Sequence, residues 1–181
     1  YGTPSYAQVS WGESKVKGCT TLFDCRKDIN AIYIKNTKNE DVAKSRKEYN
    51  FDKNEYSYVR LFSHDDVLKV FKNAFTENRI LQLAKANDHI TIFVRVDENA
   101  EIINVSFALE NNTTVVPSEI EVLENRLLHI MKFEIIGKKV FEPIYYSIAF
   151  RVYFSEVEKG EIRMARNLER LKAPNESLDA Q

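Results

Sequence analysis

The longest alternation of apolar and polar side chains lies in residues 144–154. Its even-numbered positions carry Ile144, Tyr146, Ile148, Phe150, Val152 and Phe154. Successive side chains of a β-strand point to opposite faces of the sheet, so this period of two predicts a strand with one buried face. The odd-numbered positions carry Tyr145, Ser147, Ala149, Arg151 and Tyr153. This mixture predicts that the other face is at least partly hydrated.

Two further alternating segments predict a hairpin. Residues 89–97 place Ile90, Ile92, Val94 and Val96 on one face, and residues 103–109 repeat the pattern after a short polar turn at 97–100. Shorter extended segments are expected at 31–35 and 56–62. The polar residues 36–56 predict a long loop with room for one helical turn.

Apolar residues at three- and four-residue steps predict two amphipathic helices. The first begins near Ser63 and continues to about residue 84, with a break near 76–79. The second opens at Pro117-Ser118, and its apolar face continues to Met131. Ser63 with Asp66, and Ser118 with Glu121, have the spacing of a capping box. The glutamates of the second helix, Glu119, Glu121 and Glu124, are expected on its solvated face.

This order of elements predicts one α+β domain, an antiparallel sheet covered on one face by two helices. Residues 63–155 form the expected core. Residues 1–62 form an irregular or extended segment packed on it, and residues 156–181 a polar tail that is partly helical or disordered.

Composition excludes several classes of function. The 26 basic and 27 acidic residues are interleaved and nearly cancel, which argues against nucleic-acid binding. No apolar run approaches the ~20 residues of a transmembrane segment. No nucleotide-binding or hydrolase motif is present, and five glycines leave little for phosphate-binding loops. We therefore expect neither an enzyme nor a cofactor.

The histidines do not predict a metal site. His64 precedes Asp65 and Asp66, but adjacent helical residues point about 100° apart and do not converge on one ion. His89 and His129 have no partner at ligand spacing. No metal is expected.

Cys19 and Cys25 lie six positions apart in a segment where a loop could join them by a disulfide. The alternative is two reduced, unrelated thiols. Together with a chain that starts at Tyr1, a disulfide favours an exported protein from a signal-cleaved precursor, with simple trimming as the other explanation.

Aromatic residues gather in the N-terminal part of the chain and could bind a sugar or a peptide. They are Tyr6, Trp11, Tyr49, Phe51, Tyr56 and Tyr58. The alternative is that these rings pack on the core beneath a long loop.

Residues 90–150 resemble the C-terminal domain of TonB-type energy-transducing proteins. The resemblance runs from ITIFVRVDENAEIINVSF through EIEVLENRLLHIMKF and IIGKKV to YYSIAF, with Phe133, Gly137, Val140, Ile148 and Phe150 on the family's pattern. The chain departs from it at Asn99-Ala100, where the family prefers Asp-Gly, and at Ile135, where a proline is usual. It also looks like uncharacterised exported proteins of gut Bacteroidetes.

The resemblance implies a non-enzymatic module whose final strand pairs with an extended peptide or protein. Tyr145, Ser147, Arg151 and Tyr153 of that strand are the expected contacts. Tyr49, Tyr56 and Tyr58 belong to the N-terminal aromatic set, which is a separate candidate for binding. The competing expectation is that the strand edge is capped by the N-terminal segment or the tail. A protein that binds a small ligand or glycan through the N-terminal aromatics is the alternative function.

Overall fold

The computed structural model describes residues 11–39, 42–49, 57–61 and 63–163. Its main sheet has seven strands in the order β1-β2-β3-β7-β6-β9-β4. The bounds are β1 Lys15–Lys17, β2 Leu22–Lys27, β3 Ile32–Asn36, β4 Lys47–Glu48, β6 His89–Asp97, β7 Ile102–Leu109 and β9 Ile144–Tyr153. All neighbours are antiparallel except β4 and β9. The predicted hairpin and final strand are confirmed, and β1–β3 extend the same sheet.

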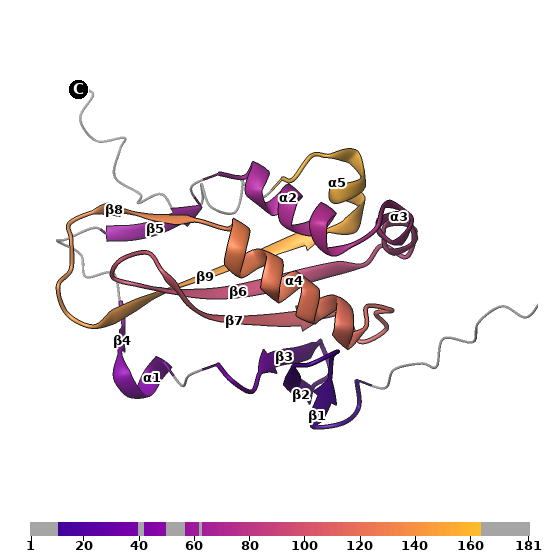
Figure 1. The fold of residues 1–181 in the computed structure, drawn as a ribbon, viewed down its shortest axis with the longest axis horizontal. Coiled ribbons are helices and arrows are strands. Elements are labelled where there is room, and N and C mark those ends of the chain that lie inside the picture. Colours follow the sequence, from indigo (N-terminus) through magenta and orange to yellow (C-terminus); the bar gives the residue numbers. More distant parts are fainter. Residues whose placement is uncertain (1–10, 40–41, 50–56, 62, 164–181) are drawn as a thin grey trace, which may run out of the picture.

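The helices shield one face of this sheet, as expected for an α+β fold. They are α2 Asp65–Ala74, α3 Glu77–Lys85, α4 Pro117–Ile130 and α5 Phe154–Lys159, with a single helical turn, α1 Val42–Ser45, before β4. Helix α2 packs against α4, and α3 packs against α5 (Figure 1). Their apolar side chains share one core with the even-numbered residues of β6 and β9. The other face of the sheet, called the open face below, is left without a helix in the described chain.

Besides the short strand β4 inside the predicted loop, a further strand and a further helix were not expected. Strand β8, Phe133–Gly137, pairs with β5, Ser57–Leu61, in a separate two-stranded sheet. Helix α5 follows β9 directly, where the sequence turns polar, because Phe154 and Val157 alone supply its buried side. The helix expected beyond residue 161, and the tail at 174–181, lie almost wholly outside the described residues.

Both predicted capping boxes are wrong, although both helices are present. Helix α2 starts after its N-cap residue, His64, whose side chain makes no capping hydrogen bond to the helix. Helix α4 starts at Pro117, within the predicted Pro117-Ser118 start, but its capping contact comes from Glu119, which accepts the Val116 N–H at 3.0 Å. The predicted break between the first two helical segments is confirmed: Thr76 is the N-cap of α3, and its side chain accepts the Arg79 N–H at 3.3 Å.

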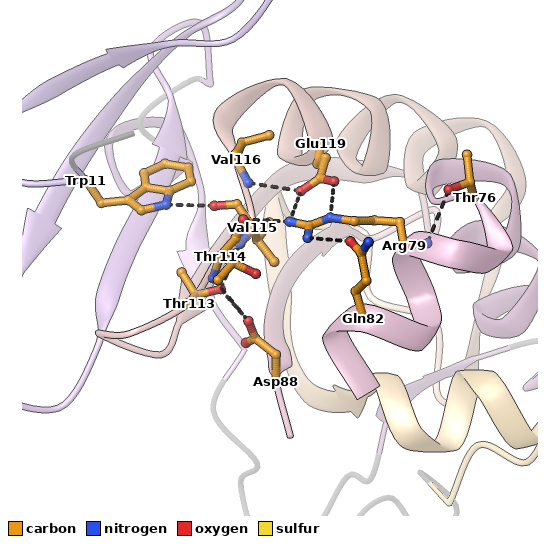
Figure 2. A network of polar contacts seen from close by, with 10 residues as sticks. All are labelled: Trp11, Thr76, Arg79, Gln82, Asp88, Thr113, Thr114, Val115, Val116 and Glu119. Atoms are coloured by element: carbon orange, nitrogen blue, oxygen red, sulfur yellow. Dashed lines mark hydrogen bonds and ion pairs between the residues drawn. The ribbon is translucent and has the colours of Figure 1, made fainter. Parts of the chain in front are cut away.

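A polar network fixes the segment that leads into α4 (Figure 2). Arg79 of α3 donates through Nε to Glu119 at 2.6 Å and through Nη2 to the Thr114 carbonyl at 2.6 Å. From the opposite side, the Trp11 indole N–H donates to the Val115 carbonyl at 2.8 Å. Asp88, just before β6, accepts the Thr113 hydroxyl at 2.7 Å. The polar side chains of this network are hydrogen-bonded to one another or to the backbone of residues 114 and 115. The network is therefore structural, and it joins α3, α4 and β6.

The expected solvation of the α4 glutamates is wrong. Glu121 and Glu124 are 5% and 4% exposed, because the β1–β2 turn and the end of β3 pack on this side of the helix. Glu121 accepts the Thr20 N–H at 3.0 Å and also the Thr20 hydroxyl, and Asn36 donates to Glu124 at 2.9 Å. The sequence pattern could not show this, because the residues that meet these carboxylates lie about a hundred positions away.

Gly18 is required by the close approach of this turn to α4. A Cβ atom built at Gly18 would collide with the Glu121 carboxylate and lie 3.2 Å from the Pro117 carbonyl oxygen. The carboxylate is held in place by Thr20, so it cannot simply move aside. Only a residue without a side chain fits at this point.

The two buried glutamates predict opposite pH dependences. The Thr20 hydrogen bonds lower the pKa of Glu121 to about 2, whereas burial raises the pKa of Glu124. The charge on Glu121 therefore stabilises the fold fully above pH 4.5, and this stabilisation is lost as the pH falls toward 2. We expect Glu121→Gln to lower the free energy of unfolding by about 1–3 kcal/mol at pH 7. The loss should shrink in urea titrations repeated below pH 4.5.

Glu124→Gln is the matched control on the same helix. Its folded-state pKa is raised, so ionisation of Glu124 disfavours the fold as the pH rises through its ordinary range. Removing that charge should leave stability at pH 7 unchanged or increased. Equal losses of stability at pH 7 for the two variants would contradict the opposite effects assigned to the charges of Glu121 and Glu124.

Candidate functional site

Strand β9 carries four predicted contact residues on the open face of the sheet. Ser147 and Arg151 are exposed, Tyr153 is half-buried, and Tyr145 is only 5% exposed. The Arg95 guanidinium lies over the Tyr145 ring at 5.0 Å, which explains that burial. Ser147 donates to Glu48 at 2.9 Å, and Arg151 donates to the Thr91 hydroxyl at 3.1 Å. The expected hydrated face is therefore confirmed, with Tyr145 as its covered end.

The two edges of β9 differ. On one side it pairs with β6 through nine successive residue pairs, from Asp97↔Tyr145 to His89↔Tyr153. On the other side β4 pairs only with Ile144 and Tyr145. Beyond that point no strand in the described chain pairs with this side, which we call the outer edge.

The residues whose backbone faces the outer edge can be identified. The Tyr145 carbonyl accepts from Tyr49 on the β4 side at 2.9 Å, and the Phe154 N–H donates to Asp88 on the β6 side at 3.1 Å. In a regular antiparallel strand, both backbone groups of alternate residues point to the same side. The N–H and C=O groups that face outward are therefore those of Ser147, Ala149, Arg151 and Tyr153.

A hollow of about 300 Å³ adjoins this edge. It is lined by Thr91, Ala149, Phe150, Arg151, Tyr153, Glu156 and Arg163. Phe150 and Arg151 point to opposite faces of β9, so the hollow reaches around the strand's edge toward α5. We call it the edge hollow.

A second hollow, of about 440 Å³, lies on the open face itself. Its lining comes from β3, β7, β6 and β9: Tyr33, Lys35, Phe93, Val94, Arg95, Asn104, Ser106, Ser147, Ile148 and Ala149. Cross-strand pairing places Lys35, Ser106, Phe93 and Ala149 in one row across the sheet. We call it the open-face hollow. Sequence reasoning missed it, although the alternation of 89–97 already placed Phe93 and Arg95 opposite the core.

The N-terminal aromatics do not form one site in the described chain. Trp11 is 6% exposed and belongs to the core. Tyr49 packs on Tyr146 with ring centroids 4.9 Å apart, and Tyr58 sits in β5 opposite Ile136. Tyr6, Phe51 and Tyr56 lie outside the described residues. The rings that are described pack on the fold at separate places.

The expected disulfide is absent, and both thiols are free. Cys19 lies in the exposed β1–β2 turn, whereas Cys25 is three residues along the extended strand that starts at Leu22. Three extended residues, about 10 Å of chain, separate Cys25 from the end of that turn, so the strand carries its thiol away from the turn that holds Cys19. Burial raises the pKa of Cys25 to about 11, so this thiol is a poor nucleophile.

The described residues contain no group of three or more His, Cys, Asp or Glu side chains placed to hold a metal ion. His89 contacts Glu110 at 3.1 Å, and burial lowers the pKa of His89, which favours the neutral ring. Within the same part of the chain, no helix is both long and apolar enough to cross a bilayer.

Comparisons with known proteins support the fold. No protein-family model matches the chain, and no curated protein does either. The crystal structure of a DUF5043 family protein from Bacteroides uniformis is similar, with a TM-score of 0.61. The two share 14% sequence identity over 81% of this chain and 94% of that one. The likeness is to a protein of a Bacteroidetes species, and at this identity it bears on the fold alone; it does not show the TonB-type arrangement.

Proposed function

We propose that this protein is a non-enzymatic binding module that recognises an extended peptide or protein segment by adding it as a strand to the outer edge of β9. The observation that carries the proposal is the unequal pairing of β9. Its inner edge is paired over nine residues, whereas β4 covers only the first two residues of its outer edge. The unpaired N–H and C=O groups of such an edge are a template for another strand.

Two further features support this mode of binding. The edge hollow provides space beside Ala149 and Arg151 for the side chains of an added strand. The resemblance to TonB-type C-terminal domains also implies strand pairing at the final strand. The glycan-binding alternative has less support, because Trp11 is buried and the Tyr49 ring packs against Tyr146.

The proposal predicts an alternating pattern of amide hydrogen exchange along β9. In the isolated monomer, the amides of Ser147, Ala149 and Arg151 should exchange at least about a hundredfold faster than those of Ile148 and Phe150, because only the latter are bonded to β6. Residue-resolved exchange measured by NMR would test this. Equal protection of both sets would mean that the outer edge is covered, and the proposal would fail.

Selection of displayed random peptides against the folded protein would then test recognition. Binding of the selected peptides should be lost in Ala149→Pro, which removes one outward N–H at an edge position where proline is tolerated. Ala149→Ser is the matched control, since it keeps the N–H and should keep the binding. Peptides that bind both variants equally, or the absence of any binder, would count against strand addition.

Export from a signal-cleaved precursor is also a proposal. The two free thiols give it no support, so it needs separate evidence. Fractionation of cells that express the complete reading frame would test it: a processed product outside the cytoplasm supports export, and an unprocessed cytoplasmic product contradicts it.

A further inference from the structure

The open-face hollow combines positive charge with exposed aromatic surface. It spans the open face from β3 to β9 and shares only Ala149 with the edge hollow, so a ligand there does not require an added strand. Its volume, about 440 Å³, falls within the range of small-molecule sites, roughly 300–1,000 Å³. Strands β3, β7, β6 and β9 form its floor.

Lys35 and Arg95 are the two charged residues of the lining. Neither forms an ion pair with any carboxylate in the part of the chain that the structure describes. Asp24 is the cross-strand partner of Lys35 but is exposed and lies outside the lining. The hollow therefore presents two cations and no carboxylate.

Carboxylates near the rim are already engaged. Asp97 accepts the N–H groups of Asn99 and Glu101 at 2.8 and 3.0 Å. Glu48 accepts the Ser147 hydroxyl at 2.9 Å. In the described chain neither carboxylate forms an ion pair with Arg95, and the ion-pair partner of Asp97 is Arg46. Stacking on the Tyr145 ring holds the Arg95 guanidinium in place, which lowers the entropy lost on binding.

Two half-buried rings supply the apolar part of the hollow. Phe93 lies on β6 in the same row as Lys35, and Tyr33 lies on β3 with the Arg26 guanidinium 5.0 Å from its ring centroid. Ser106 lies between Lys35 and Phe93 in that row and offers a hydroxyl. These rings lie beside the basic side chains of Lys35 and Arg95, so the hollow matches a ligand that has a flat apolar body and one anionic end.

We propose that the open-face hollow binds a small aromatic carboxylate. The ligand's ring packs against Phe93 and Tyr33, and its carboxylate accepts hydrogen bonds from Arg95 and Lys35. Charge complementarity and the aromatic lining together select this class over neutral sugars, which need more hydrogen-bonding partners, and over cations, which the two basic groups repel.

The test uses 2-naphthoate as the probe. The control compound is 2-naphthamide, which has nearly the same shape and no charge. Amide chemical shifts of the full chain are followed by NMR during titration with each compound. We expect saturable shifts centred on Phe93, Arg95 and Ser106 with 2-naphthoate, and about tenfold weaker binding of 2-naphthamide.

Arg95→Gln should weaken 2-naphthoate binding by about tenfold and leave 2-naphthamide binding unchanged. Arg126→Gln, which removes an exposed arginine of α4, is the matched control and should change neither affinity. Unchanged thermal unfolding of both variants establishes that they fold. Equal affinities for the two compounds, shifts spread over other surfaces, or no saturation with 2-naphthoate would overturn the proposal.

Discussion

Phe154→Ala is expected to lower the free energy of unfolding by about 3–5 kcal/mol, the usual cost of emptying a buried phenylalanine site. Phe154 is fully buried where β9 passes into α5. Its ring centroid lies 5.7 Å from that of Phe71 and 5.0 Å from that of Phe75, both on edge-to-face geometry. Alanine would leave these two rings facing a void that the helices cannot close without moving.

The loss is a large share of the ~5–15 kcal/mol that stabilises a typical domain. Urea unfolding followed by the fluorescence of Trp11, the single tryptophan, would measure it. Phe141→Ala is the matched control, because Phe141 is 85% exposed and its removal should cost less than about 0.5 kcal/mol. If Phe154→Ala cost no more than the control, the three-ring cluster would not be the packed centre described above.

Trp11→Ala is expected to lower the free energy of unfolding by a similar amount, about 3–5 kcal/mol, because it removes both a core ring and a hydrogen bond. The indole is 6% exposed and donates to the Val115 carbonyl, on the opposite side of that segment from Arg79 (Figure 2). Without it, the Val115 carbonyl is left buried and unpaired. The far-UV circular dichroism signal would monitor unfolding, since the variant has no tryptophan.

Trp11→Phe separates the two contributions. It keeps most of the ring volume and removes only the N–H, so we expect a loss of about 1–3 kcal/mol. A loss as large as that of alanine would assign the whole effect to the hydrogen bond. No loss in either variant would place Trp11 outside the core and restore it as a candidate for ligand binding.

Local periodicity was sufficient to predict the strands that form the centre of the sheet. In β6 and β9, Ile92 and Phe150 lie in unbroken period-two patterns, and burying one face of such a pattern requires extended backbone. The helices α2 to α4 were equally visible in their apolar spacing. The N-cap residues of α2 and α4 were not, because His64 and Val116 carry no side chain that marks a helix start.

The candidate site was only partly predictable. The open face of β9 followed from its odd-numbered residues, including Ser147 and Arg151. Lys35 and Tyr33 could not be joined to them, because the pairing of β3 with β7 brings together residues more than seventy positions apart in the chain. Arg95 meets Ser147 only through the pairing of β6 with β9. That Cys19 and Cys25 are both free thiols could not be predicted either, because it depends on where the turn ends and the extended strand begins.

The sequence by itself determined the central strands β6, β7 and β9, the helices α2 to α4 and the α+β class, since these follow from which side chains must leave water along a strand or a helix. Only the tertiary structure decided the environment of each polar side chain. Glu121 lies on a helix face that would be solvated in isolation, and it is buried because a distant turn donates hydrogen bonds to it. Burial and charge depend on contacts between segments far apart in the chain, and periodicity within one segment carries no information about them.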